Sequence, residues 1–176
     1  MPVRTYRLST GKAEDVECYV PGGFHPILLG DILKDGRYRI VHKLGFGSFS
    51  TVWLARDNFD VKFVCLKISK ADAPQSSDEI KILRYLAAQG KQHPGSEFVM
   101  NMSDEFIIEG PNGSHQCLVT QAAGRRFFQP ANVTYKNLGP ARLLLSQLFQ
   151  GVDYLHSCSV GHGGNCFYLF LLGELG

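Results

Sequence analysis

A glycine-rich turn is the first feature of this chain that could do chemistry. It spans residues 44–52, Leu-Gly-Phe-Gly-Ser-Phe-Ser-Thr-Val, with apolar stretches before and after it. Glycines let backbone N–H groups come close to a phosphate, because no Cβ stands in the way. Taken alone, the same spacing is also typical of a plain hairpin whose glycines take a positive φ.

Two charged residues follow the turn in a suggestive order. Lys67 lies fifteen residues after Val52, inside the apolar stretch 64–68, where an ammonium must meet an anion or extend to water. Glu79 lies one position before an apolar helical stripe and could pair with Lys67, holding it toward a phosphate. Simpler explanations are an edge-strand lysine facing water and a capping box formed by Ser76 and Glu79. The order and spacing on one chain favour the phosphate site.

The elements that must position these residues form an α+β pattern. Alternating and short apolar runs predict a five-stranded antiparallel sheet, with turns at residues 58–60 and 110–113. Residues 1–36 are rich in turn formers and are expected to form an extended arm. The predicted strand material lies at residues 37–43, 51–55, 62–69, 98–102 with 106–109, and 116–121.

Two helices are predicted from apolar stripes. Gly90 ends the first helix, and Pro140 lies where the first turn of the second tolerates proline. The second helix is expected to end near His156. The two stripes are Ile80, Leu83, Leu86 and Ala87, and Ala141, Leu145, Leu148, Val152 and Leu155.

Composition limits the class of protein. The 176 residues suggest one domain or slightly more, and 44% hydrophobic with 19% charged residues exclude disordered and fibrous classes. A net charge of +2 is too small to indicate a polyanion-binding surface. Five cysteines without a Cys-x-x-Cys pair indicate a reducing, intracellular setting. Without a secretory signal or an apolar run of about 20 residues, the protein is expected to be soluble.

The order of glycine turn, strand lysine and helix glutamate resembles the N-terminal lobe of eukaryotic protein kinases. More narrowly, the chain from about residue 19 to 163 resembles the SR-protein kinase family, in particular fungal-type members. These are serine/threonine kinases that act on Arg-Ser-rich splicing factors. Phe-Ser-Thr-Val-Trp-Leu after the glycine turn is typical of that family rather than of kinases at large. The resemblance lies in residues 23–26, 30–31, 36–38, 43–54, 78–83 and 151–156.

The resemblance implies an ATP site with Mg²⁺ as the accompanying metal. The turn would cover the phosphates, with Ser50 at its third glycine position, and Val52 would pack on adenine. Lys67 would contact the α and β phosphates and pair with Glu79. Thr120 would guard the back of the pocket, while the segment after it would bond adenine through its backbone. The implied nucleotide-binding residues are Leu44, Gly45, Gly47, Ser50, Val52, Lys67, Glu79, Thr120, Gln121 and Ala123.

The sequence departs from the family where the catalytic loop is expected. His162 is the remnant of the motif, but Gly164 replaces its aspartate and Leu169 its asparagine. Glycine cannot accept the substrate's proton, and leucine cannot bind Mg²⁺, so no catalytic or metal-binding set is intact. The chain stops at Gly176 without an Asp-Phe-Gly segment, and we expect a truncated, inactive form. We hypothesise that residues 164–176 are out-of-frame or intron-derived, which an abundant spliced transcript without a longer isoform would refute.

The resemblance also implies an organisation and partners. Residues 1–36 are the arm, 37–124 the kinase N-lobe and hinge, 125–163 the start of the C-lobe, and 164–176 a divergent tail. The partners implied are ATP and Arg-Ser-rich proteins, with no direct nucleic acid and no membrane. The implied location is cytoplasmic and nuclear.

Three other interpretations stay open. A metal site is the first, although the spacing of its four candidate ligands is not typical of zinc sites. A non-catalytic pseudokinase or scaffold that keeps Lys67 and Glu79 is the second. A non-functional fragment with an exposed apolar face, including residues 167–172, is the third. The candidate metal ligands are His156, Cys158, His162 and Cys166.

Overall fold

A computed structural model describes residues 14–73, 78–90, 93–122 and 138–161. The chain divides into two compact units, which are described separately. The sheet unit comprises residues 1–80 and 102–122, and the helical unit comprises residues 81–101 and 123–176. In the described ranges, no helix is both long and apolar enough to span a membrane.

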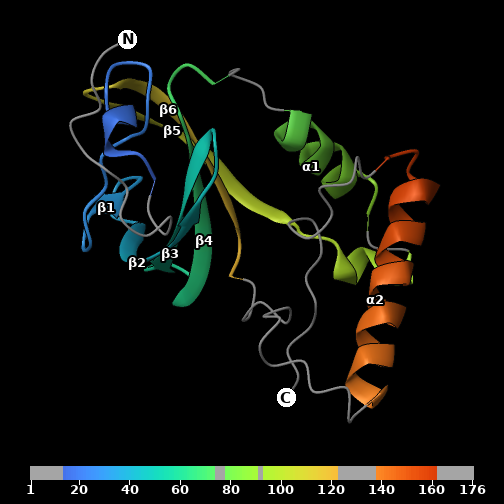
Figure 1. The fold of residues 1–176 in the computed structure, drawn as a ribbon. Helices are drawn as coiled ribbons and strands as arrows, with labels where there is room; N and C mark the ends of the chain where they lie inside the picture. Colours follow the sequence, from blue (N-terminus) through green and yellow to red (C-terminus); the bar gives the residue numbers. More distant parts are fainter. Residues whose placement is uncertain (1–13, 74–77, 91–92, 123–137, 162–176) are drawn as a thin grey trace. The chain divides into compact units, whose positions relative to one another are not determined.

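The sheet unit is built on six antiparallel strands in the order β1-β2-β3-β4-β6-β5 (Figure 1). Turns at residues 58–61 and 111–112 connect β3 to β4 and β5 to β6, as the turn sequences predict. The α+β class expected from the sequence is therefore confirmed. The strands are β1 (Ile32–Leu33), β2 (Tyr38–Phe46), β3 (Ser50–Asp57), β4 (Lys62–Ser69), β5 (Met102–Gly110) and β6 (Gly113–Gln121).

The sheet has six strands rather than the expected five. The extra strand, β1, comes from the segment expected as an arm, and its Leu33 pairs with Tyr38 of β2. Residues 98–102 also differ from the prediction, because Pro94–Phe98 form the 3₁₀ helix η2 and β5 begins at Met102. Pro94 fixes φ for a helical start, and the His93 ring accepts a hydrogen bond from the Gly95 amide at 3.0 Å.

One face of the sheet carries the core of its unit. In β3 and β4 every second residue is buried, which is the period of a strand with one covered face. Burying each large aliphatic side chain contributes about 1.5–3 kcal/mol. The buried cluster comprises Ile27, Tyr38, Ile40, Trp53, Ala55, Val64, Leu66, Ile68, Cys117 and Val119.

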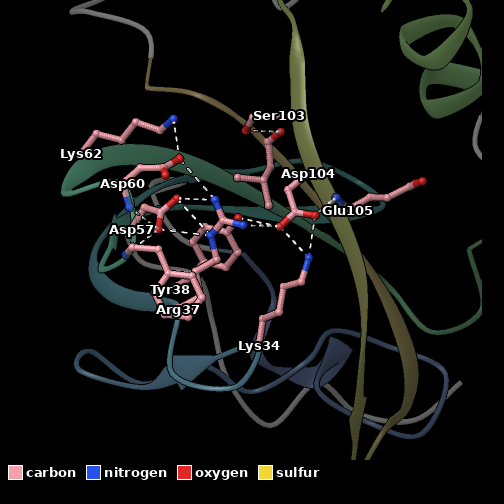
Figure 2. Close-up of polar contacts among 11 residues, drawn as sticks. Lys34, Arg37, Tyr38, Asp57, Asp60, Lys62, Ser103, Asp104 and Glu105 are labelled. Carbon is pink, nitrogen blue, oxygen red and sulfur yellow. Dashed lines mark hydrogen bonds and ion pairs between the residues drawn. The ribbon is translucent and has the colours of Figure 1, made fainter.

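A cluster of charges fixes the strand ends. Figure 2 shows the Arg37 guanidinium between the carboxylates of Asp57, at 2.9 Å, and Asp104, at 3.6 Å. Lys34 reaches Asp104 at 2.6 Å, and the Tyr38 hydroxyl donates to the same carboxylate at 2.6 Å. Hydrogen bonding to Arg37 holds the pKa of Asp57 below its ordinary value. The cluster therefore ties three segments that lie far apart in the sequence.

The helical unit packs around its own apolar cluster. It holds most of α1 (Asp78–Ala88), together with η2 and α2 (Leu138–Ser157). The Tyr154 hydroxyl donates to the Leu86 carbonyl at 3.2 Å, which joins α2 to α1 within the unit. Gly90 has a φ of +78° after α1, as expected for a helix-ending glycine. The buried cluster comprises Leu86, Val99, Tyr154 and Leu155, with Ile82, Leu148, Val152, Cys158 and Val160 packed against it.

Candidate nucleotide site

A row of residues crosses four strands on the sheet face opposite the core. Gly45 pairs with Val52, Val52 with Lys67, and Lys67 with Leu118 in the strand register. Directly opposite residues of antiparallel strands project to the same face. Val52 and Lys67 therefore share a face, next to the point where β2 turns into β3. The register thus brings together the glycine turn and the strand lysine.

The glycine turn is closed by a hydrogen bond from the Gly47 amide to the Ser50 carbonyl at 2.8 Å. Gly45 and Gly47 are not among the glycines with positive φ, so the backbone conformation does not require glycine at either position. A Cβ built on Gly45 meets no atom within 4 Å, and one on Gly47 meets only Ser50 Oγ, at 3.9 Å. β2 and β3 do form a hairpin, but a positive φ does not explain these two glycines. The open space beside them suits the close approach of a ligand.

Lys67 and Glu79 form an ion pair. Lys67 Nζ lies 2.8 Å from Glu79 Oε1 and 2.6 Å from Oε2. β4 is an inner strand between β3 and β6, so Lys67 is not an edge-strand lysine. The side chains are 35% and 31% exposed, and such accessible pairs contribute at most about 1 kcal/mol to stability. Stability alone therefore gives little reason for the pair. The alternative role of Glu79, in a capping box with Ser76, is not described because Ser76 lies outside the described residues.

The inner end of this face is formed by β4 and β6. Thr120 is 3% exposed and faces Cys65 across the strands, while Gln121 is exposed at the end of β6. Burial raises the pKa of the Cys65 thiol, more than a hydrogen bond with Thr120 lowers it. Leu54 pairs with Cys65 and so shares the face. The sequence reasoning missed both residues, although they lie two positions from Val52 and Lys67, the period of one strand face.

Known protein kinases are similar in sequence to this chain. No family model matches the chain. SRSF protein kinase 3 of Homo sapiens is 35% identical over 156 residues, which cover 85% of this chain and 27% of the relative. A serine/threonine protein kinase of Aspergillus fumigatus is 39% identical over 149 residues, 82% of this chain and 37% of the relative. Protein kinase dsk1 of Schizosaccharomyces pombe is 34% identical over 156 residues, 85% of this chain and 29% of the relative.

The chain is similar to the SR-protein kinases. It spans roughly a third of the length of the relatives that it matches and corresponds to their N-terminal part. Protein kinases as a class use ATP with Mg²⁺.

Some of the other predicted site residues lie outside the described ranges. Leu44, beside the glycine turn, is 47% exposed, whereas Ser50 at its far end is 8% exposed. Ala123 and the motif positions 162, 164 and 169 lie outside the described residues. The rival metal site is described only at His156 and Cys158, and the described ranges hold no group of three or more metal-binding side chains.

Proposed function

We propose that this chain is the nucleotide-binding part of a serine/threonine kinase of the SR-protein kinase family. The observation that carries the proposal is the row Gly45, Val52 and Lys67, completed by the ion pair between Lys67 and Glu79. It combines an uncrowded glycine turn with a fixed ammonium on one face of the sheet. ATP is the substrate chemistry that needs both features.

In the proposed complex the residues divide the work between phosphates and base. Gly45 and Gly47 leave room for the phosphates beneath the turn, and Lys67 neutralises part of their charge while Glu79 holds its ammonium. Val52 and the inner residues of the face would contact the adenine. Bound Mg²⁺ would neutralise phosphate charge, but the described residues of the site include no ligand set for it.

We further propose that the chain binds ATP without transferring phosphate. Gly164 and Leu169 occupy the positions where the family carries its base and its metal-binding asparagine. Neither side chain can accept a proton or bind a metal. This observation favours the pseudokinase or scaffold role as the second candidate function. Phosphorylation of Arg-Ser-rich proteins, and a cytoplasmic and nuclear location, are proposed for the complete family protein.

The test is thermal unfolding with and without Mg-ATP, for the wild type, Lys67→Ala and Lys62→Ala. ATP at 100 times its dissociation constant should stabilise the wild type by about 2.7 kcal/mol. Lys67→Ala should lose this shift, because the phosphates lose their ammonium. Lys62 lies on the same strand but is 52% exposed and pairs with Asp60, so Lys62→Ala should keep the shift.

Two results would count against the proposal. Equal ATP-induced stabilisation of Lys67→Ala and the wild type would refute the assignment of the ATP site to Lys67. Transfer of radiolabelled phosphate from ATP to an Arg-Ser repeat peptide, abolished in Lys67→Ala, would leave the pocket in place. That second result would refute the proposal that this chain does not transfer phosphate.

A further inference from the structure

The segment that precedes the sheet has contacts that the proposed function does not explain. Residues 18–27, here called the clasp, lie between the end of β4 and the turn joining β5 to β6. The Gly22 amide donates to the Asn112 carbonyl at 2.8 Å, and the Asn112 side-chain amide donates to the Phe24 carbonyl at 2.7 Å. On the other side, the Ala71 amide donates to the Gly23 carbonyl at 3.1 Å. The clasp therefore joins two separate parts of the sheet unit.

The clasp fits its position closely. Phe24 is 3% exposed, and His25 is 9% exposed with its ring 4.8 Å from that of His115. A Cβ built on Gly23 would overlap with the Cys18 carbonyl, and one on Gly110 would overlap with the His25 ring. Close-packed contacts of this kind leave little freedom for displacement. The clasp is therefore held in one arrangement against the sheet.

Lys70 connects the clasp to the glycine-rich turn. Its Nζ lies 4.5 Å from the centre of the Phe24 ring and 6.0 Å from that of the Phe49 ring. Its backbone amide also donates to the Phe49 carbonyl at 2.9 Å. Phe49 is 69% exposed in the turn itself. Lys70 therefore contacts the buried ring of the clasp, the exposed ring of the turn and the turn's backbone.

We propose that the clasp positions the phosphate-binding turn, with Phe24 holding Lys70 and Lys70 holding Phe49. An aromatic ring attracts an ammonium most strongly when the contact is shielded from water, and Phe24 is nearly fully buried. The ammonium is thus fixed from the clasp side, and it fixes the more exposed Phe49 in turn. Lys70 acts as a positioning residue, three positions beyond Lys67. The consequence for ATP affinity rests on the proposed function.

The experiment compares Phe24→Leu with Phe59→Leu. Leucine keeps an apolar side chain but removes the ring face. Phe59, in the β3–β4 turn, is the matched control because its ring also contacts a cation, with the Arg37 guanidinium 5.6 Å from the ring centre. Mg-ATP affinity and hydrogen exchange of the Lys70 and Gly47 amides are measured. Phe24→Leu should weaken ATP binding by about two- to fivefold, the size of one lost cation–π contact, and speed exchange at both amides. Phe59→Leu should change neither quantity.

A second variant, Lys70→Met, keeps the proposal testable if Phe24→Leu does not fold. It should reproduce both effects, and the double variant should be no worse than either single change because both act through the same contact. Unchanged exchange and affinity in Lys70→Met would overturn the proposal while leaving the nucleotide site standing. If the wild type binds no ATP, the proposed function fails instead, and the exchange rates alone decide whether the clasp positions the turn.

Discussion

Asp57 shows how one buried side chain secures a strand end. It is 1% exposed, and its carboxylate accepts hydrogen bonds from Arg37 and from the amides of Phe59 and Asp60. A buried acceptor costs the fold little free energy when all its hydrogen bonds are made. Removing the acceptor is costly because its donors are left without a partner. Asp57 therefore holds the β3–β4 turn and orients Arg37 toward Asp104 (Figure 2).

Replacing Asp57 with alanine should destabilise the sheet unit. The change removes the acceptor for N–H groups of three residues, and we expect the free energy of unfolding to fall by about 1–3 kcal/mol. The matched control is Asp60→Ala, because Asp60 contacts the same Arg37 at 3.3 Å but is 49% exposed. Urea denaturation of both variants measures the difference. Equal losses in the two variants would show that burial of Asp57 is not what makes it important.

At the scale of single residues, the sequence predicts the pair of Lys67 and Glu79 but not the charge cluster around Arg37. The pairing of Lys67 with Glu79 could be proposed from their order after the glycine turn, and the structure brings the two together. The contacts of Asp57 and Asp104 with Arg37 could not be proposed. These side chains meet because the strand register and two turns place them together, and no local spacing encodes that arrangement.

Among the elements, η2 and α2 approach each other unusually closely in the helical unit. A Cβ built on Gly95 of η2 would overlap with the backbone carbonyl of Gln150 in α2 and lie 3.0 Å from Tyr154 Cβ. Backbone atoms cannot move aside as a flexible side chain can. Glycine at this position is therefore required by packing rather than by its own conformation.

Gly95→Ala should destabilise the helical unit by about 1–3 kcal/mol, the usual cost of forcing an extra methyl into a packed contact. Gly161→Ala is the control, since a Cβ there meets nothing within 4 Å. Circular dichroism at 222 nm during heating follows the loss of helix. A melting temperature for Gly95→Ala equal to that of Gly161→Ala would contradict the close approach.

The elements also show where sequence patterns succeed and fail. The long helix was predicted because its apolar stripe has a helical period, and Leu148, Val152 and Leu155 do join the core of the helical unit. β1 was not predicted, because a strand of two residues has no period to detect. Residues 98–102 were assigned to a strand on composition, whereas the 3₁₀ helix that starts at Pro94 after the His93 cap ends only at Phe98, and β5 begins at Met102.

Lowering the pH should reduce the stability of the sheet unit in two stages. His25 is buried, its Nδ1 has no hydrogen-bond partner, and burial and His115 lower its pKa although Asp31 raises it. Below about pH 6.5, His25 therefore binds a proton more readily in the unfolded chain than in the folded chain. The free energy of unfolding falls as the pH drops below this value. Asp57 and Asp104 have lowered pKa values, so their contribution is present above about pH 4 and is lost below it.

Urea denaturation between pH 8 and pH 3 tests this order. The free energy of unfolding should begin to decline below about pH 6.5 and decline further below about pH 4. His25→Gln should flatten the first decline and leave the second. A first decline that is unchanged in His25→Gln would assign it to another group.

The short first strand has a consequence for how these molecules behave beside one another. An open strand edge can pair with a strand of another chain and begin aggregation. β1 covers β2 at Arg39 and Tyr38, and further along β2 the register with β3 shifts between Ile40 and His42 and again between Lys43 and Gly45. Such bulges interrupt the regular row of unpaired groups that a second chain would need. The β1–β2 edge of the sheet is therefore a poor template for intermolecular strand pairing.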